Sequence, residues 1–261
     1  MHRGVGKSIA VILGVSILAG QAGCSAVRGP SRAGRAPADR AAVLRPGKLG
    51  GAADGRRVFF DFWNESLIRE DVKVGTVFMG DSITELWSLS AYFVASDGTI
   101  ENRGISGDMA RAMAKRFEAD VVQLRPRNVV ILAGTNDVRE LTDAGKGDEE
   151  IVNTVVEAVL SMMDQARAAE ITTFVCSILP TNSDWNRHAN RTGLRAVIND
   201  KVKSACAARG CTYVDYAAKM SDGNGDLRKD LANDGLHPHY AGYAIMRDCL
   251  LEAARKQGVR F

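Results

Sequence analysis

From residue 58 to its end, the chain alternates short apolar runs with longer segments of mixed polarity. The apolar runs are continuous and rich in β-branched residues, which predicts buried strands, and they lie at 76–79, 99–102, 128–133, 172–177 and 212–215. Strands that alternate with helical segments predict repeated βα units and a parallel sheet. Because polar residues do not interrupt the runs, we expect helices to cover both faces of the sheet.

The segments between these runs carry apolar residues at helical spacing, which predicts helices over 109–123, 149–168, 191–208 and 239–257. Neither an internal repeat nor a second domain is evident in the pattern. We therefore predict one α/β domain over residues 58–261.

Residues 1–24 follow a different pattern. Arg3 and Lys7 precede an apolar run at 9–19, and small residues follow it up to Cys24. This order is typical of a secretory signal peptide. A transmembrane anchor is the alternative, but the run of about 11 residues is shorter than the roughly 20 that a helix needs to cross a bilayer. The leader therefore favours export.

The end of the leader, Ala22-Gly23-Cys24, is similar to a bacterial lipobox, in which the cysteine is lipidated and becomes the new N-terminus. Gln21 stands where that motif usually has leucine. We expect a protein of the cell envelope or periplasm that is lipid-anchored at Cys24, with free secretion after cleavage near Ala22 or Ala26 as the alternative.

Residues 25–57 contain three prolines, many glycines and alanines, and eight Lys or Arg against two Asp, which predicts a flexible basic tether. The whole chain carries a formal charge of +3, and leader and tether together carry +8, so residues 58–261 carry −5. An acidic domain argues against nucleic acid as a partner. Membrane contact is expected only through the N-terminal anchor.

Four cysteines follow Cys24. Cys206 and Cys211 are close enough in sequence to bridge a helix end to the next strand, which an exported protein would permit. The alternative is that all four are buried thiols that pack as small apolar groups. None has the spacing from a histidine that a zinc site needs, so we expect no metal.

Glycines and polar side chains collect directly after the predicted strands, where parallel α/β sheets bind ligands. These blocks are Gly-Asp-Ser-Ile-Thr at 80–84, Asn-Arg-Gly-Ile-Ser-Gly at 102–107, Gly-Thr-Asn-Asp at 134–137, and Asp-Gly-Leu-His-Pro at 234–238.

A serine hydroxyl becomes a strong nucleophile only when a base takes its proton and an acidic group orients that base. Ser82 can be this nucleophile, with His237 as base and Asp234 three residues before it as acid. Acyl transfer also needs hydrogen-bond donors at the developing oxyanion. The candidates are the backbone N–H groups of Ser82 and Gly104 and the side-chain amide of Asn136.

These four blocks, in this order, resemble the GDSL or SGNH hydrolase family over about residues 72–250. The resemblance implies a three-layer α/β/α sandwich of flavodoxin-like kind, hydrolysis of esters or thioesters, no cofactor and a shallow site. Position by position, it implies that Ser82 is the nucleophile, that Gly104 and Asn136 join Ser82 in the oxyanion hole, and that Asp234 and His237 complete the triad.

Residues 78–84 with Trp87, and the stretch 213–215, resemble the branch that includes carbohydrate acetylesterases and the platelet-activating-factor acetylhydrolase type. We therefore expect a serine esterase that removes short acyl groups, above all acetyl, from a carbohydrate. One alternative is a lysophospholipase or thioesterase that acts on longer acyl chains. Another is a non-catalytic surface protein that binds glycan.

Several polar residues near these blocks have simpler interpretations. Asp81 and Asp137 are expected to cap helices or hold the site loops through backbone hydrogen bonds. His188 is expected in a solvated loop and His239 at a helix start. Trp185 either stacks on a sugar ring or anchors its loop.

Overall fold

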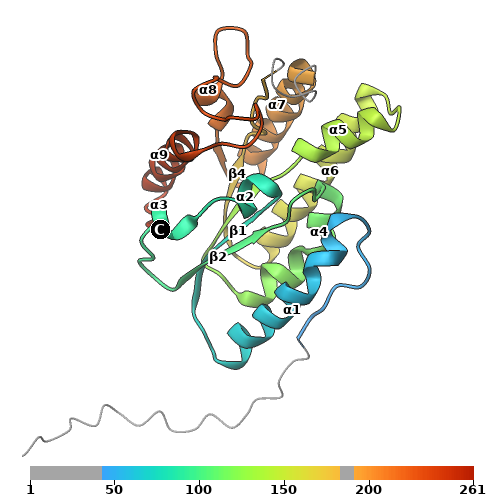
Figure 1. Ribbon diagram of the computed structural model, residues 1–261. Helices are drawn as coiled ribbons and strands as arrows, with labels where there is room; N and C mark the ends of the chain where they lie inside the picture. The colour runs from blue at the N-terminus through green and yellow to red at the C-terminus, as the bar shows by residue number, and fades with distance from the viewer. Residues whose placement is uncertain (1–42, 183–190) are drawn as a thin grey trace, which may run out of the picture. The chain divides into compact units, whose positions relative to one another are not determined.

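A parallel sheet of five strands forms the centre of the fold, in the order β2-β1-β3-β4-β5. The computed structural model describes residues 43–182 and 191–261. The strands are β1 (Val74–Gly80), β2 (Thr99–Gly104), β3 (Asn128–Leu132), β4 (Thr172–Cys176) and β5 (Thr212–Val214) (Figure 1). Every pairing between neighbours is parallel. This is the strand order of the flavodoxin-like doubly wound fold, and it confirms the predicted fold class.

Helices cover both faces of the sheet (Figure 1). One face packs against α1 (Ala52–Arg69), α4 (Ala110–Asp120), α6 (Asp148–Ala168) and α7 (Thr192–Arg209). The other packs against α2 (Ser82–Glu85), α3 (Leu89–Tyr92), α8 (Tyr216–Met220) and α9 (Tyr240–Lys256). The short η1 (Val122–Leu124) and α5 (Thr135–Asp143) complete the elements of the described residues.

The strand β1 shows why its apolar run is continuous. Val77 and Met79 point into the core under α4 and α6, whereas Phe78 points into the core under α9. Successive side chains of a strand face opposite sides of a sheet. Since both sides of this sheet are covered, every position of β1 is buried.

The predicted tether is wrong at its C-terminal end, because α1 begins at Ala52. Arg57 lies inside the fold, and its guanidinium pairs with the buried carboxylate of Asp120 and with Asp61. The leader, the lipidation site at Cys24 and the rest of the tether up to residue 42 lie outside the described residues, so their assignment stays a prediction. Among the described helices, none is both long and apolar enough to cross a membrane.

The cysteines of the described residues are free thiols, namely Cys176, Cys206, Cys211 and Cys249. Cys206 is buried in the core, and burial raises the pKa of its thiol to about 12. Instead of a disulfide, the Cys211 N–H donates to the Cys206 carbonyl at 3.0 Å, where α7 ends. The structure therefore has no Cys206–Cys211 disulfide, and the alternative of buried thiols holds for Cys176 and Cys206, whereas Cys211 and Cys249 are half-buried.

A fully buried guanidinium, that of Arg116 in α4, joins the ends of two strands. Its Nη2 donates to the carbonyls of Gly80 at 3.2 Å and Arg103 at 2.9 Å. Its Nε donates to Asp108 at 2.8 Å, and its Nη1 to Asp120 at 2.9 Å. Hydrogen bonds between charged partners in a dry interior are strong. Removal of one partner leaves the other charge buried and unpaired, which strongly destabilises the fold.

We expect Arg116→Met to lower the free energy of unfolding by about 3–5 kcal/mol, because Asp108 and Asp120 would stay buried with fewer partners. Urea unfolding followed by circular dichroism measures this. Lys115→Met is the matched control on the exposed side of the same helix, and we expect it to change the free energy of unfolding by about 0.5 kcal/mol or less. Equal effects of the two substitutions would contradict this account.

Candidate functional site

The register of the sheet brings three of the predicted blocks to one level. Gly80 at the end of β1 pairs with Gly104 of β2 on one side and with Leu132 of β3 on the other. The segments that follow these strands therefore begin side by side at the carboxyl edge of the sheet, where ligands bind in this class of fold.

The structure brings Ser82, His237 and Asp234 together at this edge. Ser82 Oγ lies 2.9 Å from His237 Nε2, and His237 Nδ1 lies 2.5 Å from Asp234 Oδ2. Serine and histidine are 155 positions apart in the chain. The contact is open to solvent, since the side chains of His237 and Asp234 are 30% and 51% exposed.

The loop after α8 holds Asp234 in place through its own backbone. Asp234 Oδ1 accepts the N–H groups of Leu236 at 2.9 Å and His237 at 2.7 Å. Burial alone would raise the pKa of Asp234, but the hydrogen bonds from the His237 ring, His237 N–H and Leu236 N–H outweigh it and lower that pKa. The carboxylate therefore stays ionised and fixes the orientation of the imidazole.

The single turn of α2 that carries Ser82 is held on three sides. Asp81 caps it by accepting the Ile83 N–H at 2.9 Å. The Tyr243 hydroxyl, from α9, donates to the Ile83 carbonyl at 2.8 Å, and the Asn102 amide, from β2, donates to the Thr84 carbonyl at 2.7 Å. Elements from both sides of the turn thus fix the position of Ser82.

Gly104 does not have the free N–H that its predicted oxyanion role requires. Its N–H donates to Asn102 Oδ1 at 2.9 Å. Position 104 requires glycine for a different reason. A Cβ at this position would lie 2.2 Å from the backbone nitrogen of Glu85 in α2. The structure therefore corrects the prediction: Gly104 allows β2 and α2 to approach closely.

Gly107, at the end of the same block, is the better candidate. It is exposed, has φ +80°, and its N–H has no hydrogen-bond partner within residues 43–182 and 191–261. The Ser82 N–H is likewise without a partner in that part of the chain. Asn136 lies beside this loop, because its Nδ2 donates at 2.9 Å to the carbonyl of Asp108, the residue that follows Gly107. Sequence reasoning missed Gly107, although its block contains two glycines.

Glu85 is a further residue that sequence reasoning missed. Its Oε2 accepts the backbone N–H of Ser106 at 2.6 Å and also the Ser106 hydroxyl, and its Oε1 pairs with Arg56 of α1. The loop that carries Gly107 is thereby tied both to the turn that carries Ser82 and to α1. Only three positions separate Glu85 from Ser82, but nothing in the sequence indicates this contact.

Two buried acids support the site, in the capping roles expected for them. Asp137 accepts the Ala110 N–H at 2.9 Å at the start of α4, and burial raises its pKa to about 6. Burial raises the pKa of Asp81 to about 7, and its Oδ2 is buried without a hydrogen-bond partner among the described residues. His239 caps α9 as expected, whereas His188 and Trp185 lie outside the described residues.

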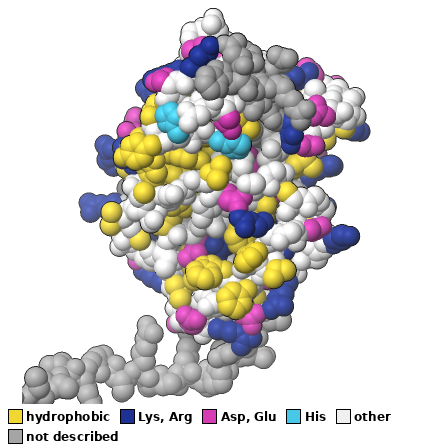
Figure 2. Space-filling model, viewed as in Figure 1, with side chains coloured by type: hydrophobic (Ala, Val, Ile, Leu, Met, Phe, Trp, Pro, Cys, Tyr) yellow, Lys and Arg dark blue, Asp and Glu magenta, His cyan; other side chains and the backbone are white. Residues whose placement is uncertain are grey.

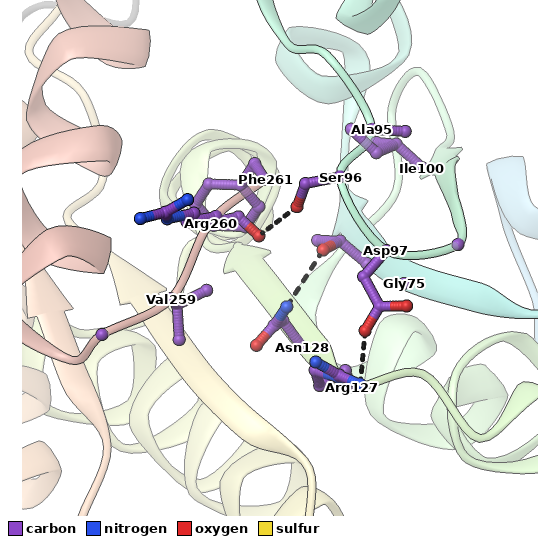
Figure 3. A pocket seen from close by; sticks show the side chains of 13 residues that line it. Gly75, Ala95, Ser96, Asp97, Ile100, Arg127, Asn128, Val259, Arg260 and Phe261 are labelled. Carbon is purple, nitrogen blue, oxygen red and sulfur yellow. Dashed lines mark hydrogen bonds and ion pairs between the residues drawn. The ribbon is translucent and has the colours of Figure 1, made fainter.

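A cavity of about 340 Å³ at the opposite edge of the sheet has none of these residues in its wall (Figure 3). It lies near the starts of β1 to β3 and the last residues of the chain. Its polar groups bond largely to one another: Asn128 donates to Thr76 Oγ1 at 3.3 Å, and the Ser96 hydroxyl donates to the Arg260 carbonyl at 3.1 Å. The candidate site is thus the open surface around Ser82.

The arrangement at the carboxyl edge can perform nucleophilic acyl substitution. The His237 imidazole is placed to take the proton of the Ser82 hydroxyl, and Asp234 is placed to stabilise the imidazolium that results. The N–H groups of Ser82 and Gly107, which have no partner among the described residues, can donate to an oxyanion.

Comparison with known proteins agrees with this chemistry. The chain matches the model of the GDSL-like lipase/acylhydrolase family over residues 78–245. A GDSL-like lipase from Bacteroides thetaiotaomicron is 29% identical, with 77% of this chain and 97% of that chain covered and a TM-score of 0.66. A mutant of an acetylxylan esterase from Geobacillus stearothermophilus shares the fold at 22% identity and a TM-score of 0.57, with 72% of this chain and 99% of that chain covered. None of the curated proteins compared with the chain matches it.

The buried acid before Ser82 makes stability depend on pH. Because the pKa of Asp81 is raised to about 7 in the folded protein from an ordinary value of 3.8, the folded state keeps a proton that the unfolded state releases between these values. The contribution of protonated Asp81 to the free energy of unfolding is therefore full below about pH 4, and it is lost as the pH rises through about 7.

We expect Asp81→Asn, whose amide oxygen can still cap Ile83, to remove this dependence. From pH 5 to pH 8, the wild-type protein should lose about 3 kcal/mol of unfolding free energy relative to the variant. Urea unfolding at both pH values measures the difference, and Asp248→Asn, at an exposed position, is the control. Parallel pH profiles for the wild type and Asp81→Asn would contradict the prediction.

Proposed function

The chain belongs to the GDSL-like lipase/acylhydrolase family, and we propose that it cleaves short acyl esters with Ser82 as nucleophile, His237 as general base and Asp234 as the orienting acid. As a member of this family it is a carboxylic ester hydrolase, which sets aside the alternative of a non-catalytic glycan-binding protein. The observation that carries the residue roles is the unbroken chain of contacts from Ser82 Oγ to His237 Nε2, at 2.9 Å, and from His237 Nδ1 to Asp234, at 2.5 Å.

In the first half-reaction, Ser82 Oγ attacks the ester carbonyl carbon while its proton passes to His237 Nε2. The carbonyl oxygen becomes an oxyanion, which accepts hydrogen bonds from the N–H groups of Ser82 and Gly107 and from the Asn136 amide. Gly107 takes the place first given to Gly104. The intermediate collapses, the C–O bond to the alcohol breaks, and His237 returns the proton to the leaving alcohol.

In the second half-reaction, water attacks the acyl-enzyme. His237 accepts one proton of this water, a second oxyanion forms in the same place, and the ester bond to Ser82 breaks. The proton on His237 returns to the serine oxygen, and the carboxylic acid leaves. Both half-reactions thus use the same three side chains.

We propose an acetyl ester on a carbohydrate as the substrate. The side chains of His237 and Asp234 are 30% and 51% exposed, so the site can accept a bulky polar alcohol such as a sugar chain. The acetylxylan esterase with the same fold acts on such an ester. A small acyl group also suits an open site, since it needs little apolar surface around it.

A longer acyl chain is the second candidate. Leu86 follows α2 directly and is 57% exposed, which supplies apolar surface four positions after Ser82. The similar protein from Bacteroides thetaiotaomicron is described as a lipase. This candidate would make the enzyme a lysophospholipase or thioesterase that uses the same triad.

We expect Ser82→Ala to lower kcat for p-nitrophenyl acetate by about 10³-fold or more, because the acyl-enzyme can no longer form. Ser204→Ala is the control, because Ser204 is exposed on α7 and its hydroxyl bonds to the Asp200 carbonyl. Initial rates at saturating ester measure the effect. Unchanged hydrolysis by Ser82→Ala would refute the proposed mechanism.

The length of the acyl group separates the two substrate candidates. We expect kcat/KM to be highest for the acetyl ester and to fall for butyryl and octanoyl p-nitrophenyl esters, because a long chain would find little buried apolar surface. Stopped assays with this series measure the preference. An optimum at octanoyl would favour the lysophospholipase or thioesterase instead.

A further inference from the structure

The helix α1 exposes four large apolar side chains and buries two polar ones. Val58, Phe59, Phe62 and Trp63 are 73%, 66%, 69% and 51% exposed. The residues that α1 buries are Ala53, Arg57, Asn64 and Leu67. A helix on the surface of a soluble domain normally has the opposite arrangement. The exposed apolar surface of α1 therefore calls for an explanation other than packing against the sheet.

These four residues form one continuous surface, which we call the aromatic face of α1. They occupy positions i, i+1, i+4 and i+5, which lie together on one side of a helix. Figure 2 shows a group of hydrophobic side chains over α1, with basic and acidic side chains beside it. Large apolar side chains gathered in this way on a protein surface mark a place of contact with a membrane or a partner.

The inner side of α1 explains how the helix stays folded without burying this face. The Arg57 guanidinium pairs with Asp120, and the Asn64 amide donates to Asp120 Oδ1 at 2.9 Å and to the Ala119 carbonyl at 3.0 Å. Asn64 Oδ1 accepts from the Arg103 guanidinium at 2.9 Å. Polar contacts thus anchor α1, together with the buried Ala53 and Leu67. Trp63 Nε1 also donates to Glu101 at 3.2 Å, whereas the side chains of Val58, Phe59 and Phe62 stay exposed and available to another surface.

We propose that the aromatic face of α1 docks on the surface of a bilayer that contains anionic lipid, with the helix lying in the plane of the interface. Trp and Phe side chains favour the boundary between headgroups and acyl chains. A helix of this kind is held by buried apolar area together with electrostatic attraction of basic residues to anionic headgroups.

The basic component comes from the chain that leads into α1. Residues 24–51, which follow the predicted leader, contain six Lys or Arg and one Asp. Where the described chain begins, the Leu44 N–H donates to Gln123 Oε1 at 2.9 Å, and Arg45 pairs at 2.5 Å with Glu65 of α1 itself. The basic segment therefore joins the domain next to the helix that carries the aromatic face, and its charge is complementary to an anionic leaflet.

The aromatic face of α1 acts on a lipid surface whether or not Cys24 is modified, so it can be tested without the modification.

The test compares binding of the full chain to vesicles of phosphatidylcholine and phosphatidylglycerol at a ratio of 7 to 3 with binding to pure phosphatidylcholine. We expect tighter binding to the anionic vesicles, and we expect Phe59→Ser with Phe62→Ser to weaken it about tenfold or more. The leader is the same in both proteins, so the difference reports on α1. Val94→Ser with Val197→Ser is the matched control, because these exposed valines lie away from α1, and we expect it to bind like the wild type.

A local measurement shows whether α1 itself enters the interface. Trp63 is 51% exposed, so brominated phosphatidylcholine in the anionic vesicles should quench its fluorescence, and Trp63→Phe should lose that part of the quenching. Hydrolysis of p-nitrophenyl acetate and the thermal unfolding midpoint should be the same in the wild type and in Phe59→Ser with Phe62→Ser, which shows that the fold and the active site are intact.

Equal vesicle binding by the wild type and the double phenylalanine variant would overturn the proposal, as would quenching that persists in full without Trp63. Sedimentation velocity distinguishes the other occupant. If the wild type were a dimer in solution and the double phenylalanine variant a monomer, the aromatic face would be an interface between two copies of this chain, and the lipid assignment would be wrong.

Discussion

The buried guanidinium of Arg116 is the contact on which both the fold and the site depend. It binds the carbonyls at the ends of β1 and β2 and the carboxylate of Asp108. Asp108 directly follows Gly107, and its carbonyl accepts the Asn136 amide. One desolvated charge thus holds two strand ends and the loop with the candidate oxyanion donor in a fixed relation. The same contact that stabilises the sheet edge defines where the reaction takes place.

Rigid support of this kind suits acyl transfer. Donors that already point at the developing oxyanion need no reorganisation during the reaction, and this is where such sites gain most of their rate. The turn of α2 is fixed by Asp81, Tyr243 and Asn102, and the Gly107 loop by Glu85. Burial of Asp81 is an unfavourable contribution to stability that comes with this rigidity, since its second oxygen has no partner among the described residues.

The sequence was sufficient to predict the sheet, because strands that are covered on both faces have continuous apolar runs such as 128–133. It was also sufficient to predict that Ser82, Asp234 and His237 lie together, because functional residues in parallel α/β folds follow the strands. It was not sufficient for α1, whose buried face contains Arg57 and Asn64, so apolar periodicity gave no signal of a packed helix. The choice between Gly104 and Gly107 as oxyanion donor depends on which of their N–H groups bonds to the Asn102 side chain, and the sequence contains no signal of this contact.

The position of α1 also determines where the catalytic domain begins. The apolar pattern would place its first residue at 58, yet Arg56 pairs with Glu85, Arg57 pairs with Asp120, and Ala52 lies beside Gly107. A truncated protein that starts at residue 58 would leave Glu85, behind the Gly107 loop, without its Arg56 partner, and Asp120, in the core, with Arg116 but without Arg57. The smallest fragment that can keep the geometry of the site must therefore include the first turn of α1, together with Asp54, which accepts the N–H groups of Leu49 and Gly50 just before it.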